Sequence, residues 1–366
     1  MQCAALKSEF AVTTAGLSPI SDSKIEFIKL NGHIKKAPFS FHQKYHSLIR
    51  FPFSLINKFY MNMFGSNASY SLEDFEILNK KEFDLIICHH PDSLEIAEKL
   101  KRKNKCKIIF NAHEIYPYEF EFDKEWMNRN FKRLDHILTK YLPNFDAVFS
   151  VNKEISDFYS SRYKCKTVTV HNSKAYKNLQ PSQSKTPIRI IHHGGAMPQR
   201  KLELMADAVL ACNGKYELTF MLMSTNNDYL KTLKHKYEPL GIIFVEPVEY
   251  SQIIEAINQY DVGLYILPND TINHELALPN KVFEFIQAKL ALVTSPNAAI
   301  KNLILKYHLG IVSKEFTAES MAETLNNLTV NDIERFKSKA KEFSKELSSE
   351  KDEERILNTV KNLILN

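Results

Sequence analysis

The sequence predicts an α/β protein with two doubly wound, Rossmann-like domains that face a cleft. Short apolar runs alternate with amphipathic segments in two successive blocks, the pattern of parallel sheets covered by helices. A polar segment containing Pro181 separates the blocks at residues 174–185. The 366 residues also exceed the length of roughly 250–300 at which single cores stop growing. We expect an N-terminal domain at 1–178, a C-terminal domain at 186–345 and a last helix at 346–366 that packs back toward the first domain.

The first block is expected to contain strands joined by helices. Residues 1–10 have the pattern of the end of a helix, so the first strand expected of such a domain is missing before them. Asp92 and Glu95 are spaced as in a capping box and predict the start of a helix. A longer amphipathic helix carries Phe131, Leu134 and Leu138 on one face. The predicted strands of this block are 10–16, 25–30, 84–88, 106–110, 147–150 and 167–170.

The second block repeats the alternation of strand and helix. One helix is expected to begin near Lys201, another begins at Pro279–Asn280, and two charged helices fill residues 331–365. The predicted strands of this block are 188–191, 216–221, 242–245, 262–265, 290–294 and 310–312.

The composition excludes several classes of protein. Hydrophobic content of 44%, charged content of 25% and a net charge of +5 describe an ordinary soluble protein with a mild preference for anions. The five scattered cysteines favour buried thiols over disulfides or a zinc site. We find no signal peptide, no membrane-spanning run and no nucleic-acid-binding module. The Walker motif and the G-x-G-x-x-G motif are also absent, which argues against P-loop NTPases and Rossmann dehydrogenases.

Residues 33–63 are both basic and aromatic. Such a segment suits contact with anionic lipid headgroups. A helical arm that packs on its own domain with its lysines outward explains the composition equally well. Both interpretations stay open.

Residues 278–288 form the most informative segment. Pro279 and Asn280 are typical of a helix start, where Asn280 can supply a side-chain oxygen to the first free amides. Lys281 and Glu284 then lie in the first turn, where the helix dipole and unpaired N–H groups attract an anion such as phosphate. A carboxylate there can also accept two hydrogen bonds from a vicinal diol. The alternative is a capped helix whose Glu284 only complements the dipole.

Gly194 and Gly195 directly follow a predicted strand. Glycines there let the backbone approach a ligand closely and expose its amides. Arg200 and Lys201 come next and would offer two cations to a diphosphate. Glycine pairs are common at strand ends, however, and an Arg-Lys pair on a surface helix is usually solvated.

Histidines follow two strands of the first block. His113-Glu114 ends one strand and His89-His90 another, at the edge of a parallel sheet where ligands bind. A histidine there can donate to a substrate hydroxyl or stabilise developing charge. Adjacent residues of an extended chain point to opposite faces, so each histidine pair offers one metal ligand per side. We predict no metal site.

Taken in order, these segments resemble the GT-B glycosyltransferases, and among them the large family 4 of retaining enzymes that use nucleotide sugars. The most specific segment is residues 278–285, which read LPNKVFEF. Residues 111–114 (NAHE) look like the family's DAHE segment, and residues 170–172 (VHN) look like its inter-domain stretch. The resemblance covers nearly the whole chain and includes Gly194-Gly195, Arg200-Lys201, residues 244–248 and residues 261–264.

The resemblance implies a role for each matched residue. Glu284 would hold the ribose diol of the donor, and Arg200 and Lys201 would neutralise the diphosphate leaving group without a bound metal or cofactor. His113, with Glu114 beside it, would face the transferred sugar at the catalytic centre. The backbone around Val245–Pro247 would bind the base. The remaining donor-binding candidates are Gly194, Gly195, Asn280 and Lys281.

The sequence departs from the family pattern in three ways. An acidic residue is usual eight positions before Glu284, and Leu276 stands there with Glu275 beside it. Either Glu275 substitutes, or backbone amides near residues 277–280 hold the sugar. Residues 288–293 lack the Gly and Pro of the family's aGlPV segment. The missing first strand matters most, because its following loop lies on the acceptor side in this fold.

The sequence therefore predicts a glycosyltransferase that moves a hexose-type sugar from a nucleoside-diphosphate donor to a cell-surface glycan or its lipid-linked precursor. We expect the protein in the cytoplasm, with contact to an anionic membrane as an open alternative, and without a nucleic-acid partner. Two other functions stay open. One is a nucleotide-sugar epimerase of GT-B architecture, and the other is a degenerate GT-B module that binds without catalysis.

Overall fold

The computed structural model describes residues 5–6, 9–16, 26–30, 72–224 and 227–365. The chain divides into two compact units. Unit 1 takes in Met1–Ser150, Ser156–Thr169 and Ile356–Asn366, and unit 2 takes in Val151–Ile155 and Val170–Arg355. The predicted domain limits at residues 178, 186 and 345 remain predictions.

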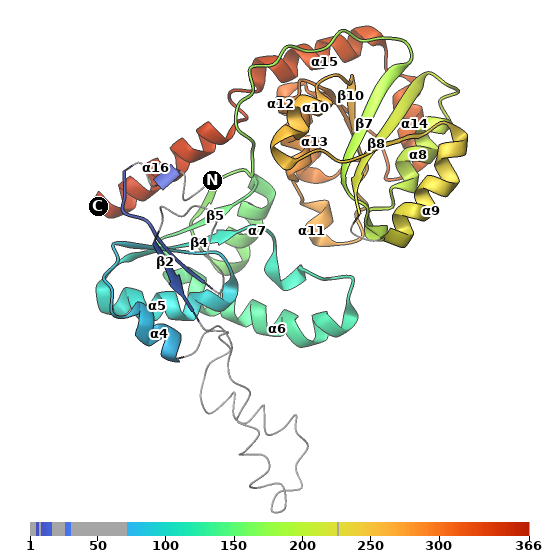
Figure 1. The fold of residues 1–366 in the computed structure, drawn as a ribbon. Helices are drawn as coiled ribbons and strands as arrows, with labels where there is room; N and C mark the ends of the chain where they lie inside the picture. Colours follow the sequence, from blue (N-terminus) through green and yellow to red (C-terminus); the bar gives the residue numbers. More distant parts are fainter. Residues whose placement is uncertain (1–4, 7–8, 17–25, 31–71, 225–226, 366) are drawn as a thin grey trace, which may run out of the picture. The chain divides into compact units, whose positions relative to one another are not determined.

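Unit 1 contains a parallel sheet whose described strands follow the order β3-β4-β5-β6 (Figure 1). Ile108, Ile109 and Phe110 are successive residues of one strand and all are fully buried, as expected for a strand covered on both faces. Two short strands, β1 and β2, form a separate parallel pair. The strands are β1 (Thr13–Gly16), β2 (Glu26–Lys29), β3 (Leu85–Cys88), β4 (Lys107–Ala112), β5 (Ala147–Ser150) and β6 (Thr167–Thr169).

Amphipathic helices connect the strands of unit 1. The buried side of one helix is formed by Leu94, Ile96, Ala97 and Leu100, at the spacing of a single helix face. The C-terminal end of the chain contributes to the same unit, where Ile356 and Val360 are buried. The helices are α4 (Leu72–Leu78), α5 (Leu94–Asn104), α6 (Lys124–Tyr141), α7 (Lys153–Tyr163) and α16 (Ser349–Leu365).

The helix predicted at Asp92 begins differently from the prediction. A short 3₁₀ turn at Pro91–Ser93 comes first, and α5 follows with no side-chain cap. Asp92 forms an ion pair with Arg133 of α6, and the Asp92 amide N–H donates to the His90 ring. The predicted capping box of Asp92 and Glu95 is therefore wrong, because an arginine far away in the sequence takes the Asp92 carboxylate.

Unit 2 contains a second parallel sheet, with described strands in the order β12-β11-β10-β7-β8-β9. β7 and β8 pair over their whole lengths, so that Gly194 lies opposite Leu222 and Gly195 opposite Met223. Both glycines are therefore part of β7, whereas the sequence had placed them after the strand. The strands are β7 (Ile188–Gly195), β8 (Tyr216–Met223), β9 (Ile243–Val245), β10 (Val262–Tyr265), β11 (Ala291–Thr294) and β12 (Gly310–Val312).

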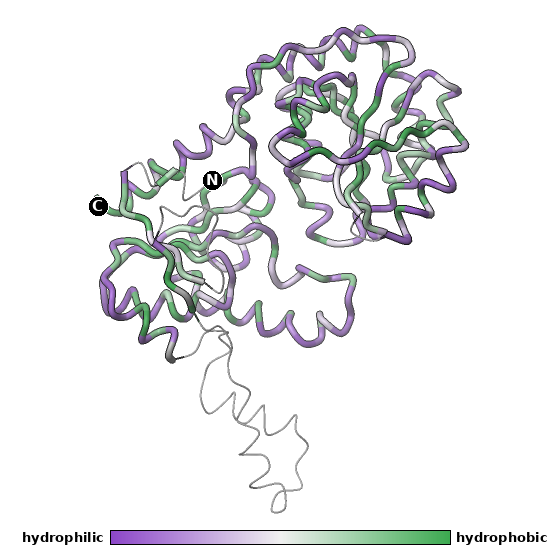
Figure 2. Tube along the Cα trace, viewed as in Figure 1, coloured by the Kyte–Doolittle hydropathy of each residue, from purple (hydrophilic) through white to green (hydrophobic). Residues whose placement is uncertain are grey.

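Helices cover both faces of this sheet, as Figure 1 shows within unit 2. Leu264 packs with α8, α9 and α14 on one face, and its neighbour Tyr265 packs with α10, α12 and α13 on the other. Figure 2 shows the hydrophobic colour along the central strands and the hydrophilic colour along much of α15. The helices are α8 (Glu203–Leu210), α9 (Asn227–Tyr237), α10 (Ile253–Ile257), α11 (Ile272–Glu275), α12 (Asn280–Gln287), α13 (Ala298–Tyr307), α14 (Ala318–Asn326) and α15 (Val330–Phe343).

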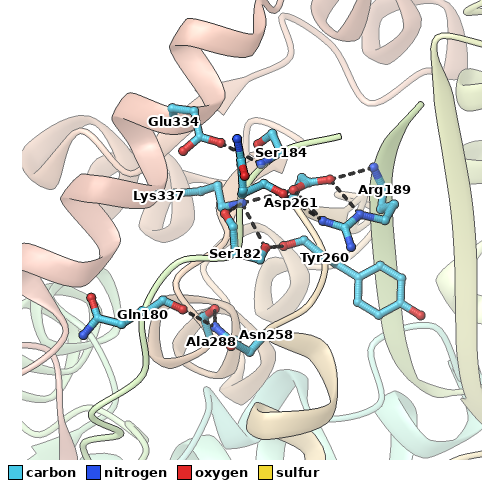
Figure 3. A network of polar contacts seen from close by, with 11 residues as sticks. Gln180, Ser182, Ser184, Arg189, Asn258, Tyr260, Asp261, Ala288, Glu334 and Lys337 are labelled. Carbon is cyan, nitrogen blue, oxygen red and sulfur yellow. Dashed lines mark hydrogen bonds and ion pairs between the residues drawn. The ribbon is translucent and has the colours of Figure 1, made fainter. Parts of the chain in front are cut away.

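A buried polar network fixes the polar segment before β7 to the body of unit 2 (Figure 3). Lys337 of α15 is fully buried, and its ammonium donates to the Ser182 carbonyl at 2.5 Å and to Asp261 Oδ1 at 3.1 Å. Arg189 of β7 donates to both carboxylate oxygens of Asp261. The predicted linker is thus held in place at Ser182 by a charge network.

Three predictions concern the environment of the chain. No helix in the described residues is long and apolar enough to cross a membrane. The basic and aromatic segment at 33–63 lies outside the described residues, so its contact with lipid remains a prediction. Cys88, Cys106, Cys165 and Cys212 are free thiols.

Candidate functional site

Helix α12 carries residues that the sequence singled out, but Glu284 is the fifth residue of the helix and lies beyond the first turn in which the sequence placed it. Pro279 is the N-cap residue and Asn280 is the first residue of the helix, with no side-chain hydrogen bond capping it. The predicted cap by the Asn280 side chain is therefore wrong, because Asn280 lies one position too late. Glu284 lies on the buried side of α12 and is 4% exposed. A carboxylate held at this depth needs partners, and their arrangement defines the site.

The end of β7 passes close to the first turn of α12. Gly194 has φ +133°, a backbone conformation that side chains rarely adopt. A Cβ atom at this position would lie 3.1 Å from Lys281 Nζ. The glycine thus lets the Lys281 ammonium lie against the backbone of the strand.

Lys281 lies in a polar cluster built from four elements: α12, β10, β7 and the short helical turn Pro198–Arg200. Its Nζ is 4.4 Å from the centre of the Tyr265 ring and 3.5 Å from His192 Nε2. Arg200 Nη1 donates to the Tyr265 hydroxyl at 3.2 Å. Two cations are therefore gathered around one tyrosine at the carboxyl ends of β7 and β10, which is the end of a parallel sheet where ligands bind.

The protonation states of this cluster follow from its burial. His192 Nδ1 donates to the Leu264 carbonyl at 2.9 Å, because a carbonyl only accepts, so Nε2 presents a lone pair toward the Lys281 ammonium. Burial lowers the pKa of His192 well below its usual value and keeps the ring neutral. Burial, followed by the Arg200 charge, lowers the pKa of Lys281 to about 7, while Glu284 acts in the opposite direction. An anion bound here would favour the charged lysine.

Two nitrogens flank the Glu284 carboxylate. Lys174 Nζ is 3.3 Å from Oε1, and His193 Nε2 is 3.4 Å from Oε2. Within the described residues, neither approach has hydrogen-bond geometry, and His193 Nε2 is buried without a hydrogen-bond partner. Burial lowers the pKa of His193 to about 3, so its ring is neutral. Glu284 is thus a buried acid whose oxygens keep unused capacity to accept hydrogen bonds.

Lys201 forms its ion pair with Asp270, a residue outside the Lys281 cluster. It has φ +46° after the short helical turn Pro198–Arg200, and α8 begins at Glu203. Lys201 Nζ is 3.7 Å from Asp270 Oδ2, and the other oxygen of Asp270 is 2.8 Å from His274 Nδ1. The Lys201 side chain is 55% exposed, so a change of rotamer can redirect its charge.

The predicted base-binding segment lines a hollow. Val245 and Pro247 border a cavity of about 210 Å³ together with Leu222, Ser224 and Lys234. Leu222 is the strand partner of Gly194, and Val245 is the partner of Met221. The hollow therefore lies at the carboxyl ends of β8 and β9, the same end of the parallel sheet as Gly194 in β7.

Glu275 stands beside Leu276, where the family pattern has an acid. Burial raises the pKa of Glu275. Both alternatives, Glu275 as a substitute acid and backbone amides near residues 277–280 as the sugar contact, remain predictions.

In unit 1, a histidine cluster lies at the carboxyl end of β4. The rings of His89 and His113 stack with centres 5.9 Å apart, and Asn111 Nδ2 lies 3.0 Å from His113 Nε2 and 3.3 Å from His89 Nδ1. An amide nitrogen only donates, so both ring nitrogens accept and the proton of His113 is on Nδ1. Burial lowers the pKa of both histidines, that of His89 to about 4. His113 is therefore a neutral hydrogen-bond donor.

Glu114 is held beside this cluster. Its carbonyl accepts from the Tyr159 hydroxyl at 2.9 Å. Burial, followed by the negative charge of Glu119, raises the pKa of Glu114 to about 7, and His90 opposes the shift. Glu114 is therefore an acid that changes its charge near neutral pH, as a group in proton transfer requires.

Sequence reasoning missed several members of these clusters. Tyr265 lies in a predicted strand, His192 and His193 follow the predicted strand 188–191, and Lys174 belongs to no recognised motif. The histidine pair after residue 191 gave the only usable signal, because two histidines inside an apolar strand require buried partners. The other contacts depend on chain segments that meet only in the fold.

The sequence itself matches no protein-family model and no curated protein. Several solved structures are similar. TarM of S. aureus, solved with fondaparinux, α-GlcNAc-glycerol and UDP, has a TM-score of 0.62 at 15% identity, over 80% of this chain and 58% of TarM. HepE of Anabaena, solved with UDP, has a TM-score of 0.62 at 12% identity, over 79% and 81% of the two chains. This chain thus spans less than two thirds of the TarM chain.

The pneumococcal O-GlcNAc transferase GtfA, solved with UDP and GlcNAc, is similar with a TM-score of 0.59 at 14% identity, over 81% of this chain and 61% of GtfA. The chain has the GT-B fold. Its two parallel α/β units agree with the prediction of two Rossmann-like domains. At these identities the similarity establishes the fold, and function has to be argued from the clusters described above.

Proposed function

We propose that this protein is a glycosyltransferase that transfers a hexose-type sugar from a nucleoside-diphosphate donor to a glycan or lipid-linked acceptor. One observation carries the proposal: two cations, Arg200 and Lys281, and an incompletely paired buried acid, Glu284, gather at the carboxyl ends of the unit 2 strands. The two cations would bind a diphosphate, and the carboxylate would accept hydrogen bonds from a ribose diol. The similar structures of TarM, HepE and GtfA support it, because each was solved with UDP.

The cationic pair would act on the leaving group. Charge on the diphosphate grows as the bond to the sugar breaks, so Arg200 and Lys281 would bind the transition state more strongly than the donor. A bound diphosphate would also restore the proton that burial tends to remove from Lys281. Two protein cations give this chemistry a route that needs no metal ion. Gly194 and Gly195 would supply a close backbone approach, and Lys201 would join them after a rotamer change.

The remaining donor-binding residues would hold the nucleoside. Glu284 would accept two hydrogen bonds from the ribose hydroxyls with the oxygen capacity that it leaves unused in the protein. The hollow beside Val245 and Pro247 has room for a nucleobase. Asn280 would offer its backbone amide at the start of α12, where the helix dipole favours an anion.

In unit 1, His113 would donate a hydrogen bond to the transferred sugar, with Glu114 as the nearby acid. Retention of the anomeric configuration, as in family 4, is part of the proposal. So are an acceptor that belongs to polysaccharide biosynthesis and a location at the inner face of the cell membrane. The charge of the 33–63 segment supports that location.

Calorimetric titration with UDP-, GDP-, ADP- and CDP-sugars tests the donor site. We expect saturable binding of at least one donor, loss of that binding in Glu284→Ala and unchanged binding in the control Glu255→Ala. Glu255 is a suitable control because it is a half-exposed carboxylate of the same unit, paired with Lys177. No saturable binding by the wild type, or wild-type binding in Glu284→Ala, would overturn the proposal.

Incubation of the best donor with and without acceptor extracts tests the reaction. Transfer to a glycan or lipid, or slow hydrolysis of the donor alone, supports the glycosyltransferase. Conversion of the donor into an epimer without acceptor would instead identify a nucleotide-sugar epimerase, and binding without any reaction would identify a non-catalytic module.

A further inference from the structure

Lys174 falls within the predicted N-terminal domain at 1–178, yet its backbone is held at a fixed place in unit 2. It forms a parallel β-bridge with Ser348, and the Ser349 amide donates to the Lys174 carbonyl at 2.8 Å. Two residues later, the Tyr176 amide donates to the Glu350 carboxylate at 3.1 Å. These bonds join the segment after β6 to the start of α16. The Lys174 side chain therefore starts from a fixed backbone.

The side chain of Lys174 reaches from this anchor to the candidate donor site. Its Nζ lies 3.3 Å from Glu284 Oε1 and 4.7 Å from the centre of the Tyr250 ring, and it donates to the Tyr250 hydroxyl. The Lys174 side chain is 13% exposed and that of Glu284 is 6% exposed. The two charges are thus largely removed from water, where their interaction is stronger than at a surface.

Lys174 is the cation that balances Glu284 in this arrangement. The other close nitrogen, His193 Nε2, belongs to a neutral ring, since burial lowers the pKa of His193 to about 3. His193 is 4% exposed and its Nε2 has no hydrogen-bond partner in the described residues, so the ring faces the carboxylate without holding it tightly. Lys281, on the same helix as Glu284, is directed to Tyr265 and His192.

We propose that Lys174 is a positioning residue for ribose recognition. It holds the Glu284 carboxylate in place and balances its charge, so that the carboxylate accepts hydrogen bonds from both hydroxyls of the donor ribose. The inference rests on the proposed function, because it assumes that a nucleoside diphosphate binds at Glu284. Tyr250, whose hydroxyl accepts from Lys174, fixes the end of the lysine side chain. Lys174 acts through Glu284 and is not a catalytic residue.

The test uses the full-length protein and a pair of ligands that differ only in the diol, UDP and 2′,3′-dideoxy-UDP. UDP is the probe because the similar structures hold it. If another diphosphate binds best in the donor panel, that diphosphate and its dideoxy form replace the pair. Lys174→Met removes the charge and keeps most of the side-chain volume. Lys177→Met is the matched control, since Lys177 lies in the same segment and pairs with the half-exposed Glu255 at 2.6 Å.

We expect the wild type and Lys177→Met to bind UDP at least tenfold more tightly than dideoxy-UDP. Lys174→Met should lose about tenfold in affinity for UDP and change less than twofold for dideoxy-UDP, so that the preference for the diol largely disappears. Lys174→Arg, which keeps a cation, should restore part of the preference. Thermal unfolding of each variant verifies that the fold is intact.

Two outcomes would overturn the inference while leaving the proposed function intact. One is a Lys174→Met variant that keeps the wild-type preference for the diol. The other is an equal loss of affinity for both ligands, which a merely structural role of Lys174 would produce. Failure of the wild type to bind any nucleoside diphosphate would instead overturn the proposed function, and this inference with it.

Discussion

Two of the carboxylates that unit 2 buries, Asp261 and Glu284, are paired in opposite ways. Asp261 is fully buried, and its two oxygens accept four hydrogen bonds of 3.0–3.1 Å from Arg189 and Lys337 (Figure 3). Glu284 is almost as deeply buried, but its nearest nitrogens lie at 3.3 Å and 3.4 Å, outside hydrogen-bond geometry. One acid is saturated by the protein, and the other leaves its oxygens with unused acceptor capacity.

The difference separates a structural charge from a functional one. Desolvating a carboxylate costs free energy that hydrogen bonds must offset, and the partners of Asp261 do so within the protein. Glu284 receives only part of this compensation from Lys174 and His193. A protein tolerates such a deficit where a ligand supplies the missing hydrogen bonds. The comparison therefore predicts that mutations of the two acids have opposite effects on stability and on binding.

The largest expected effect concerns Asp261. Asp261→Asn keeps the shape but removes the charge that balances the fully buried Lys337 ammonium, so the free energy of unfolding should fall by about 3–5 kcal/mol. Denaturant titration measures this change. The control Glu342→Gln, in the pair of Glu342 with Lys339 at the surface, should cost at most about 1 kcal/mol. Equal losses in the two variants would contradict the structural role of Asp261.

Glu284→Gln should affect ligand binding more than it affects the free energy of unfolding. Replacing Glu284 by its neutral isostere removes the counter-charge of Lys174, but Lys174 is 13% exposed and keeps the Tyr250 hydroxyl as an acceptor, whereas Lys337 is fully buried. The free energy of unfolding should therefore fall by clearly less than in Asp261→Asn. Affinity for the best nucleoside diphosphate should fall about a hundredfold, equivalent to about 2.8 kcal/mol. Denaturation and calorimetry on the same sample measure both quantities. Destabilisation as large as that of Asp261→Asn would remove the distinction between the two acids.

Lys281 should make stability depend on pH. Its pKa is lowered to about 7 in the folded protein from a usual value of 10.5, so the unfolded chain binds more protons between these values. Stability from this group is therefore fully present above pH 10.5 and is lost as the pH falls through 7, with a slope of at most about 1.4 kcal/mol per pH unit. Lys281→Met should lack this slope between pH 7 and 9 when its unfolding is compared with that of the wild type. Parallel pH profiles would show that the folded protein keeps the lysine charged.

The smallest effect concerns Glu114 in unit 1. Its pKa is raised to about 7, so the folded state retains a proton that the unfolded chain releases above its usual value of 4.5. Stability from this group is therefore present below pH 4.5 and is lost as the pH rises through 7. Glu114→Gln should unfold at a higher temperature than the wild type at pH 8 and at the same temperature at pH 4.5. A melting-temperature difference that does not change with pH would contradict the raised pKa.

Most of the fold could be predicted from local patterns. The strands at 147–150, 262–265 and 310–312 have the predicted bounds, because each is a short apolar run between turns. β7 is longer than predicted, since Gly194 and Gly195 pair with β8 and a lone sequence gives no sign of that pairing. The capping box at Asp92 failed for a similar reason, because Arg133 is 41 residues away.

The candidate site could be predicted only in part. Lys281 and Glu284 were found through the helix start at Pro279, which is a local signal. Lys174, Tyr250 and Tyr265 could not be found in this way, because each reaches the site from a different segment and none belongs to a motif. The pairing of Lys201 with Asp270 is also a product of the fold. Charged residues that come together beyond the carboxyl ends of the strands can be identified only once the arrangement of the strands is known.

The division of α16 between the units has a consequence for biosynthesis. Its last residues, from Ile356, belong to unit 1, where Ile356 and Val360 are buried and Lys361 pairs with Glu9 at 2.6 Å. The ribosome makes these residues after all of unit 2, so unit 1 is translated first but completed last. A nascent chain therefore carries an unfinished apolar surface on unit 1 until translation passes residue 360, and chaperones have their longest opportunity to bind there.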